Sequence, residues 1–176
     1  HKALCEGLKD SGAKVINIGM GPTPMTYFAH FHLKSDAVIM VTGSHNPSEY
    51  NGFKMVLNKH SFYAEDIQSL QKLIDQNNLK LTEGEIINQN IKKEYINRLL
   101  QNINLNKKIK IAWDIGNGAM GVVIKEITSN LNNSDNILIN EEVDGNFPNH
   151  HPDPTVPKNM EQLVKVVKDK NCDIGL

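Results

Sequence analysis

The sequence carries its clearest structural signal in residues 36–47, which read DAVIMVTGSHNP. Residues 36–41 form an almost unbroken apolar run of strand length, which is typical of a strand buried on both faces of a sheet. Residues 42–47 are rich in Gly, Ser, Asn and Pro, so they are predicted to form a loop. Because open α/β sheets place their ligand sites at the carboxyl ends of strands, this loop is the first candidate for a functional site.

Helices and short strands alternate on both sides of this segment. Apolar residues at helical spacing predict helices at residues 4–8, 26–33 (where Thr26 would be the cap), 64–76, 91–101, 121–131 and 160–167. Short apolar runs predict strands at residues 15–18, 36–41, 53–57, 109–113 and 137–140, and the opening of another at 172–176. This alternation predicts an α/β fold of two domains with mixed or parallel sheets, residues 1–104 and 105–176, each expected to be incomplete in this chain.

The composition is that of an ordinary globular protein, since 39% of the 176 residues are hydrophobic and 22% are charged. A net charge of -1 offers no basic excess to neutralise a phosphate backbone, so no nucleic-acid partner is expected. No apolar run approaches the roughly 18 residues of a membrane span, so no membrane partner is expected either. The two cysteines, Cys5 and Cys172, form no CxxC pair, which argues against a zinc finger or a disulfide scaffold and favours a cytoplasmic location.

The loop after residue 41 contains side chains suited to phosphoryl transfer. Ser44 offers a hydroxyl nucleophile, His45 an adjacent titratable ring, and Asn46 an amide that can orient either group. Asn-Gly at residues 51–52 predicts a tight turn, and a hairpin return would bring Lys54 back beside Ser44. A lysine near a serine can neutralise phosphate charge and move a proton. The alternative is an ordinary turn with a solvated histidine.

A second candidate is the glycine-rich segment GNGAMG at residues 116–121. It follows a predicted strand, opens a predicted helix, and has Glu141 about twenty residues further on, which is the context of a dinucleotide site. Asp114 stands just before the glycines, where its carboxylate would repel a pyrophosphate. The alternative is a turn whose glycines allow close packing of helix and strand.

A third candidate is the long loop at residues 142–157, which contains four of the seven prolines. His150, His151 and Asp153 suggest a metal site in this loop. However, adjacent histidines point in diverging directions and no further ligand motif accompanies them. A connection braced by prolines is therefore the favoured interpretation.

Together these segments resemble the α-D-phosphohexomutase family, and most of all its bacterial phosphomannomutase/phosphoglucomutase enzymes. The matching segments are residues 21–24 (GPTP), 42–54 (TGSHNPSEYNGFK), 114–121 (DIGNGAMG) and 142–159. The second and fourth of these are long and specific, and the resemblance spans nearly the whole chain. It also implies that the glycine-rich segment belongs to a second domain and binds no nucleotide.

The resemblance implies a reaction and roles for three residues. Ser44 would be the phosphorylated serine of an enzyme that interconverts hexose 6-phosphate and hexose 1-phosphate, of mannose, glucose or both, through a bound glucose or mannose 1,6-bisphosphate. His45 and Lys54 match positions that the family uses for proton transfer and for charge around the phosphoserine. A phosphate oxygen on Ser44 would be one ligand of the catalytic Mg²⁺.

The chain departs from the family pattern at its end. The family's other metal ligands are aspartates of a D-G-D-x-D-R-like loop on the strand that begins here at Asp173, and the sequence stops at Leu176. The chain alone is therefore expected to have little or no activity, and the C-terminal part of the same enzyme is an expected partner. The alternatives are a non-catalytic fragment and a nucleotide-dependent oxidoreductase that uses residues 116–121.

Overall fold

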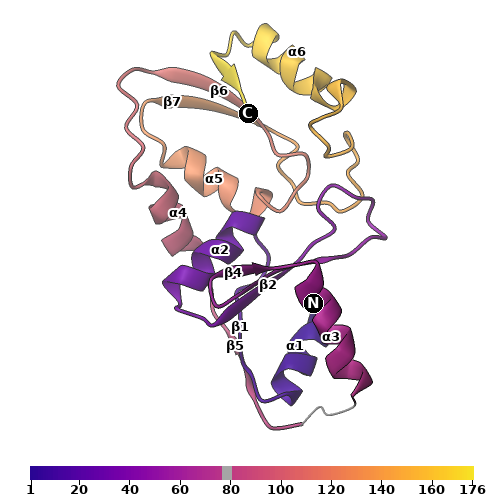
Figure 1. Cartoon of the computed structure of the whole chain (residues 1–176). Helices are drawn as coiled ribbons and strands as arrows, with labels where there is room; N and C mark the ends of the chain where they lie inside the picture. The colour runs from indigo at the N-terminus through magenta and orange to yellow at the C-terminus, as the bar shows by residue number, and fades with distance from the viewer. Residues whose placement is uncertain (77–80) are drawn as a thin grey trace. The chain divides into compact units, whose positions relative to one another are not determined.

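The protein is described by a computed structural model that covers residues 1–76 and 81–176 (Figure 1). These residues form two compact units. The first unit contains residues 1–19, 23–42 and 51–91, and the second contains residues 20–22, 43–50 and 92–176. The predicted α/β fold with mixed and parallel sheets is confirmed. The domain boundary proposed after residue 104 stays a prediction.

Helices and strands alternate along the chain. The helices are α1 Lys2–Asp10, α2 Thr23–His32, α3 Glu65–Asp75, α4 Lys92–Leu100, α5 Gly121–Ser129, the 3₁₀ helix η1 Pro157–Met160, and α6 Glu161–Asp169. The strands are β1 Lys14–Asn17, β2 Ala37–Val41, β3 Phe53–Leu57, β4 His60–Phe62, β5 Glu85–Asn88, β6 Ile109–Asp114, β7 Ser134–Ile139 and β8 Ile174–Gly175. No helix in the described ranges is both long and apolar enough to cross a lipid bilayer.

The first unit contains two small sheets. Strands β1 and β5 pair in parallel, and β2, β3 and β4 form an antiparallel sheet in that order. Helix α1 packs against β1, and α2 packs against β2. The α2 side chains of Met25 and Ala29 are buried, at 1% and 4% exposure, so they anchor this helix in the apolar interior.

Two local expectations for this unit are wrong. Strand β2 is only half-buried, because it is the outer strand of its sheet among the described residues and pairs with β3 alone. Thr26 does not cap α2, because the helix begins at Thr23 and places Pro24 in the first turn, where a missing N–H does no harm. Thr26 is instead buried in the helix, and its hydroxyl donates to Met40 Sδ at 3.2 Å.

The second unit is built on a parallel sheet with the strand order β7-β6-β8. Helices α5 and α6 cover opposite faces of this sheet (Figure 1), as expected when successive right-handed crossovers run in opposite directions. The central strand contributes Ala112, and α5 contributes Ile124; both are fully buried. The carboxyl end of β6 places Asp114 beside the loop that follows β7, which is the edge of the sheet where α/β proteins bind ligands.

Candidate functional site

The loop that contains Ser44 connects β2 to β3 and belongs to the second compact unit. Two backbone hydrogen bonds shape it, from Asn46 N to the Gly43 carbonyl and from Tyr50 N to the Pro47 carbonyl, each 3.0 Å long. Gly43 is required here, because a Cβ atom at this position would lie 2.7 Å from the Tyr50 carbonyl oxygen. The loop therefore closes tightly at its base while its outer residues face solvent.

Ser44 lies at an exposed, conformationally unusual point of this loop. Its φ is +57°, in the left-handed region, which costs a non-glycine residue about 1 kcal/mol. The Ser44 hydroxyl lies 3.4 Å from His45 Nδ1, and both residues are exposed. A hydroxyl presented to solvent beside an imidazole is suited to nucleophilic or phosphoryl chemistry, and a strained backbone is common at functional positions.

Lys54 is positioned by the hairpin return of the chain. The predicted return is confirmed, because β3 runs antiparallel to β2 with Lys54 opposite Met40. The predicted tight turn at residues 51–52 is wrong, since the turns lie at residues 44–45 and 48–49. Gly52 instead lies against Thr42: its carbonyl accepts the Thr42 N–H at 2.9 Å. Lys54 is exposed near the start of β3, and its catalytic role, like those of Ser44 and His45, stays a prediction.

The glycine-rich segment 116–121 uses its backbone groups within the second unit. The N–H groups of Gly116, Asn117, Gly118 and Gly121 all have protein acceptors: Asp114 Oδ1 and the carbonyls of Asn140, Ile115 and Gly118, respectively. A Cβ at Gly121 would lie 2.2 Å from the Glu141 carbonyl oxygen, so this glycine allows the start of α5 to pack closely against the loop that follows β7. These four N–H groups are unavailable to a pyrophosphate, and this favours the packing interpretation over a dinucleotide site.

Asp114 and His150 form a largely buried polar pair at the carboxyl end of β6. His150 Nε2 lies 2.9 Å from Asp114 Oδ2, with side-chain exposures of 16% and 7%. The other oxygen of Asp114 accepts the Gly116 N–H at 3.0 Å and the Asn140 side-chain amide at 2.9 Å. The His150 Nδ1 atom lies 2.9 Å from the His151 carbonyl. The pair thus fastens the long loop to the glycine-rich segment.

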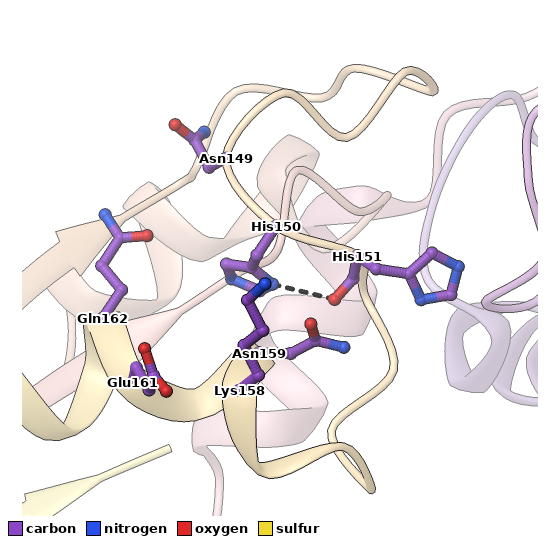
Figure 2. Close-up of a pocket in the computed structure, with 7 residues that line it drawn as sticks. All are labelled: Asn149, His150, His151, Lys158, Asn159, Glu161 and Gln162. Atoms are coloured by element: carbon purple, nitrogen blue, oxygen red, sulfur yellow. Dashed lines mark hydrogen bonds between the residues drawn. The ribbon is translucent and has the colours of Figure 1, made fainter.

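A cavity of about 470 Å³ opens beside this pair (Figure 2). The residues that line it are all of polar or charged types: Asn149, His150, His151, Lys158, Asn159, Glu161 and Gln162. Figure 2 shows that the ring of His151 points away from that of His150. The two histidines therefore do not converge on one point, as the sequence indicated, and His150 already has Asp114 as its partner.

Asp153 is fixed by a short turn in the same long loop. Its Oδ1 atom accepts hydrogen bonds from Thr155 N at 2.9 Å and Thr155 Oγ1 at 2.7 Å. These hydrogen bonds lower the pKa of Asp153, and the nearby charges of His45 and His151 lower it further. The hydrogen bonds from Thr155 therefore favour the ionised form of the Asp153 carboxyl.

Comparisons with known proteins cover almost the whole chain. Residues 1–80 match phosphoglucomutase/phosphomannomutase, alpha/beta/alpha domain I, and residues 93–176 match alpha/beta/alpha domain II of the same family. The chain belongs to the phosphoglucomutase/phosphomannomutase family. The resemblance drawn from the sequence is confirmed.

Individual members of the phosphoglucomutase/phosphomannomutase family show how much of an enzyme this chain represents. It is 43% identical to the phosphomannomutase/phosphoglucomutase of Pseudomonas putida over 98% of this chain and 37% of that protein. A phosphoglucomutase of Neisseria meningitidis is 40% identical over 97% of this chain and 37% of its own length. The crystal structure of a family protein from Burkholderia thailandensis matches with a TM-score of 0.91 and 35% identity, over 99% of this chain and 40% of that one. The chain thus spans about two-fifths of the length of the relatives that it matches.

The family implies a magnesium ion, and the described residues fit only part of such a site. In residues 1–76 and 81–176, no group of three or more His, Cys, Asp or Glu side chains is placed to hold a metal ion. The Ser44 hydroxyl is a poor ligand by itself, whereas a phosphate on it would supply the hard oxygen donors that Mg²⁺ prefers. Among the described residues, a phosphorylated Ser44 would therefore fit one ligand position of such an ion.

Two features of this phosphohexomutase chain were not anticipated from its sequence. The Asp114–His150 pair joins residues 36 positions apart, and only the placement of both residues in family-like segments indicated a shared role. The second feature is the turn in which Thr155 N and Thr155 Oγ1 both donate to Asp153 Oδ1. The Asp-x-Thr pattern at residues 153–155 is the local signal that marks Asp153 as part of a hydrogen-bonded turn.

Proposed function

We propose that the protein containing this chain interconverts hexose 6-phosphate and hexose 1-phosphate, of mannose, glucose or both, with a phosphoserine at Ser44. The observation that carries the proposal is the presentation of Ser44: an exposed hydroxyl on a left-handed residue, 3.4 Å from an imidazole. The names of the matched relatives, phosphomannomutase/phosphoglucomutase and phosphoglucomutase, support the same substrate class.

The proposed reaction consists of two phosphoryl transfers. In the first, the Oγ–P bond of phosphorylated Ser44 breaks while an O–P bond forms at the free sugar hydroxyl, whose proton passes to a base. The product is glucose or mannose 1,6-bisphosphate. In the second, the other phosphate returns to Ser44 Oγ, and the sugar oxygen that it leaves takes up a proton. Such transfers depend mainly on positioning and on stabilisation of the transferring charge.

His45 and Lys54 are proposed to serve these steps from the two sides of the hairpin. His45 is placed by the loop itself, with Nδ1 beside the Ser44 hydroxyl. Lys54, an exposed cation near the start of β3, is proposed to neutralise phosphate charge and to move the proton. We propose Mg²⁺ as the metal, with a phosphate oxygen on Ser44 as one ligand and aspartates outside this chain as the others. When bound, it would supply electrostatic stabilisation of the phosphoryl group.

The proposal also covers the activity of the chain by itself, its domain boundaries and its location in the cell. The chain by itself is proposed to be inactive, with the C-terminal part of the same enzyme as its partner. The proposed domains are residues 1–104 and 105–176. A cytoplasmic location is proposed because Cys5 and Cys172 are both free thiols.

The test is a pair of variants of the complete gene product, Ser44→Ala and Ser48→Ala. Both serines are exposed in the same loop, so both variants should fold. Conversion of glucose 1-phosphate to glucose 6-phosphate should be lost in Ser44→Ala and retained in Ser48→Ala. Peptide mass analysis of the wild-type protein should find a phosphate on the peptide that contains Ser44. Normal turnover by Ser44→Ala would exclude the proposed function.

A further inference from the structure

Asn-Gly occurs twice in this sequence, at residues 51–52 and at residues 117–118. Asparagine is among the thermolabile residues of proteins, and a following glycine makes it especially reactive, because glycine has no Cβ to shield its backbone nitrogen. Attack of that nitrogen on the side-chain amide carbon converts asparagine to aspartate or isoaspartate. The attack needs a solvated asparagine side chain and a glycine N–H that no acceptor holds, so the surroundings of each pair decide its reactivity.

The pair at residues 51–52 has the open surroundings that this reaction needs. Asn51 is exposed and lies in the irregular segment between the Ser44 loop (residues 43–50) and β3. Across residues 1–76 and 81–176, the Asn51 side chain finds no hydrogen-bond partner and the Gly52 N–H finds no acceptor. The Gly52 carbonyl, by contrast, accepts the Thr42 N–H at 2.9 Å. Both groups that must react are therefore available.

The pair at residues 117–118 has the opposite surroundings. Asn117 is 4% exposed, its Nδ2 donates to the Glu142 carbonyl at 2.9 Å, and its Oδ1 accepts Asn149 Nδ2 at 3.0 Å. The Gly118 N–H donates to the Ile115 carbonyl at 2.9 Å. These hydrogen bonds must break before the glycine nitrogen can attack, and at the usual strength of a hydrogen bond they slow the reaction by about tenfold or more.

We infer that Asn51 is a site of spontaneous deamidation, and that its conversion opens the hairpin at the base of the Ser44 loop. In the first step, a bond forms between Gly52 N and Asn51 Cγ, the Cγ–Nδ2 bond breaks, and ammonia leaves with the proton of the Gly52 N–H. Water then opens the resulting succinimide ring at one of its two carbonyl groups. The product is aspartate or isoaspartate at position 51, so each conversion consumes one water and releases one ammonia.

Isoaspartate at position 51 alters the hairpin between Ser44 and Lys54. The main chain then runs through the former side chain and is one methylene longer just before Gly52. The hydrogen bond from Thr42 N to the Gly52 carbonyl joins the hairpin where the chain leaves β2 and returns to β3, and the added methylene displaces Gly52 from it. The expected loss of turnover rests on the proposed function, whereas the deamidation itself does not.

The first measurement is peptide mass analysis of the complete gene product after incubation at mildly alkaline pH, where the glycine nitrogen attacks faster. Conversion of asparagine is read from the peptides that contain residues 51 and 117, so the protected pair is an internal control. In the folded protein, position 51 should convert faster than position 117 by about tenfold or more. In urea, where neither pair is protected, the two rates should be similar. Equal rates in the folded protein, or conversion of position 51 only in urea, would overturn the inference.

The second measurement follows the turnover of glucose 1-phosphate during the same incubation, each protein being compared with its own starting activity. Asn51→Gln is the test variant, because glutamine forms its cyclic imide far more slowly. Asn102→Gln is the matched control, since Asn102 is also exposed but precedes isoleucine.

The wild type and Asn102→Gln should lose turnover in step with conversion of position 51, while Asn51→Gln keeps its starting activity. Undiminished turnover by wild-type protein whose position 51 has been converted would refute the effect on the Ser44 loop. A fresh wild-type protein without turnover would instead overturn the proposed function, and the mass analysis would still decide whether Asn51 deamidates.

Discussion

Replacing Gly121 with alanine should destabilise the second unit by about 1–2 kcal/mol, even though alanine is the better helix former. The added Cβ would lie 2.2 Å from the Glu141 carbonyl oxygen and 2.9 Å from Val143 Cγ2. Ordinary Cβ contacts lie at 3.4–4 Å, so the strand-to-loop backbone at Glu141 would have to retreat by more than 1 Å. Overpacking of this kind lowers the free energy of unfolding by about 1–3 kcal/mol, and the higher helix propensity of alanine offsets at most about 1 kcal/mol of that loss.

Urea unfolding followed by the fluorescence of Trp113 measures this loss. Trp113 is the single tryptophan of the chain; it lies in β6, and its Nε1 donates to Asn136 Oδ1 at 2.9 Å, so it reports on the second unit. Gly145→Ala is the control, because a Cβ there would meet nothing within 4 Å. A Gly121→Ala midpoint equal to that of the wild type would refute the packing explanation of this glycine. So would an equal loss in Gly145→Ala.

Three further predictions concern the interior and its titrating groups. Ile124→Ala should cost about 2–5 kcal/mol in the same urea experiment, because Ile124 is fully buried in α5; a loss below 1 kcal/mol would contradict its place in the core. Asp114→Asn should cost about 3 kcal/mol, and a double-mutant cycle with His150→Gln should show coupling; additive losses would mean that the pair contributes nothing. Burial raises the pKa of Tyr95, so its stabilising effect is complete below the unfolded pKa of about 10 and is lost as the pH rises further. Melting temperatures between pH 8 and 11 should therefore fall less steeply for Tyr95→Phe than for the wild type, and identical slopes would exclude this cause.

Local sequence patterns correctly predicted helices and strands whose signals lie within their own residues. The strand expected at residues 53–57 coincides with β3 Phe53–Leu57, and the helix expected at 64–76 agrees with α3 Glu65–Asp75 within one residue at each end. The apolar periodicity and the flanking turn residues are contained within each of these segments. Strand β5 was not predicted, because its four residues EIIN become a strand only by pairing with β1, 71 positions earlier. The predicted burial of β2 on both faces is wrong for a related reason, since the sequence of a strand does not show which strands will lie beside it in the sheet.

In the candidate site, too, residues adjacent in the sequence were predicted, whereas contacts between distant residues were not. The residues of the Ser44 loop were identified because they are adjacent in the sequence and because their pattern resembles a known family. The Asp114–His150 pair was not predictable, because its two residues are 36 positions apart and meet only when the long loop reaches the carboxyl end of β6. The glycine-rich segment shows the limit of motif matching: the pattern and its context were correct for a dinucleotide site, but its N–H groups bond to the protein.

The path of the chain between the two compact units has a consequence for protein engineering and for gene exchange. The chain leaves the first unit at residue 20, returns at 23, leaves again at 43, returns at 51 and crosses finally at 92. In a chimera that joins residues 1–91 of a relative to residues 92–176 of this chain, the second unit would therefore combine a foreign Ser44 loop with native residues 92–176. Exchange of a whole N-terminal half thus changes the contacts of the second unit as well, and a graft that respects both units must keep residues 20–22 and 43–50 together with residues 92–176.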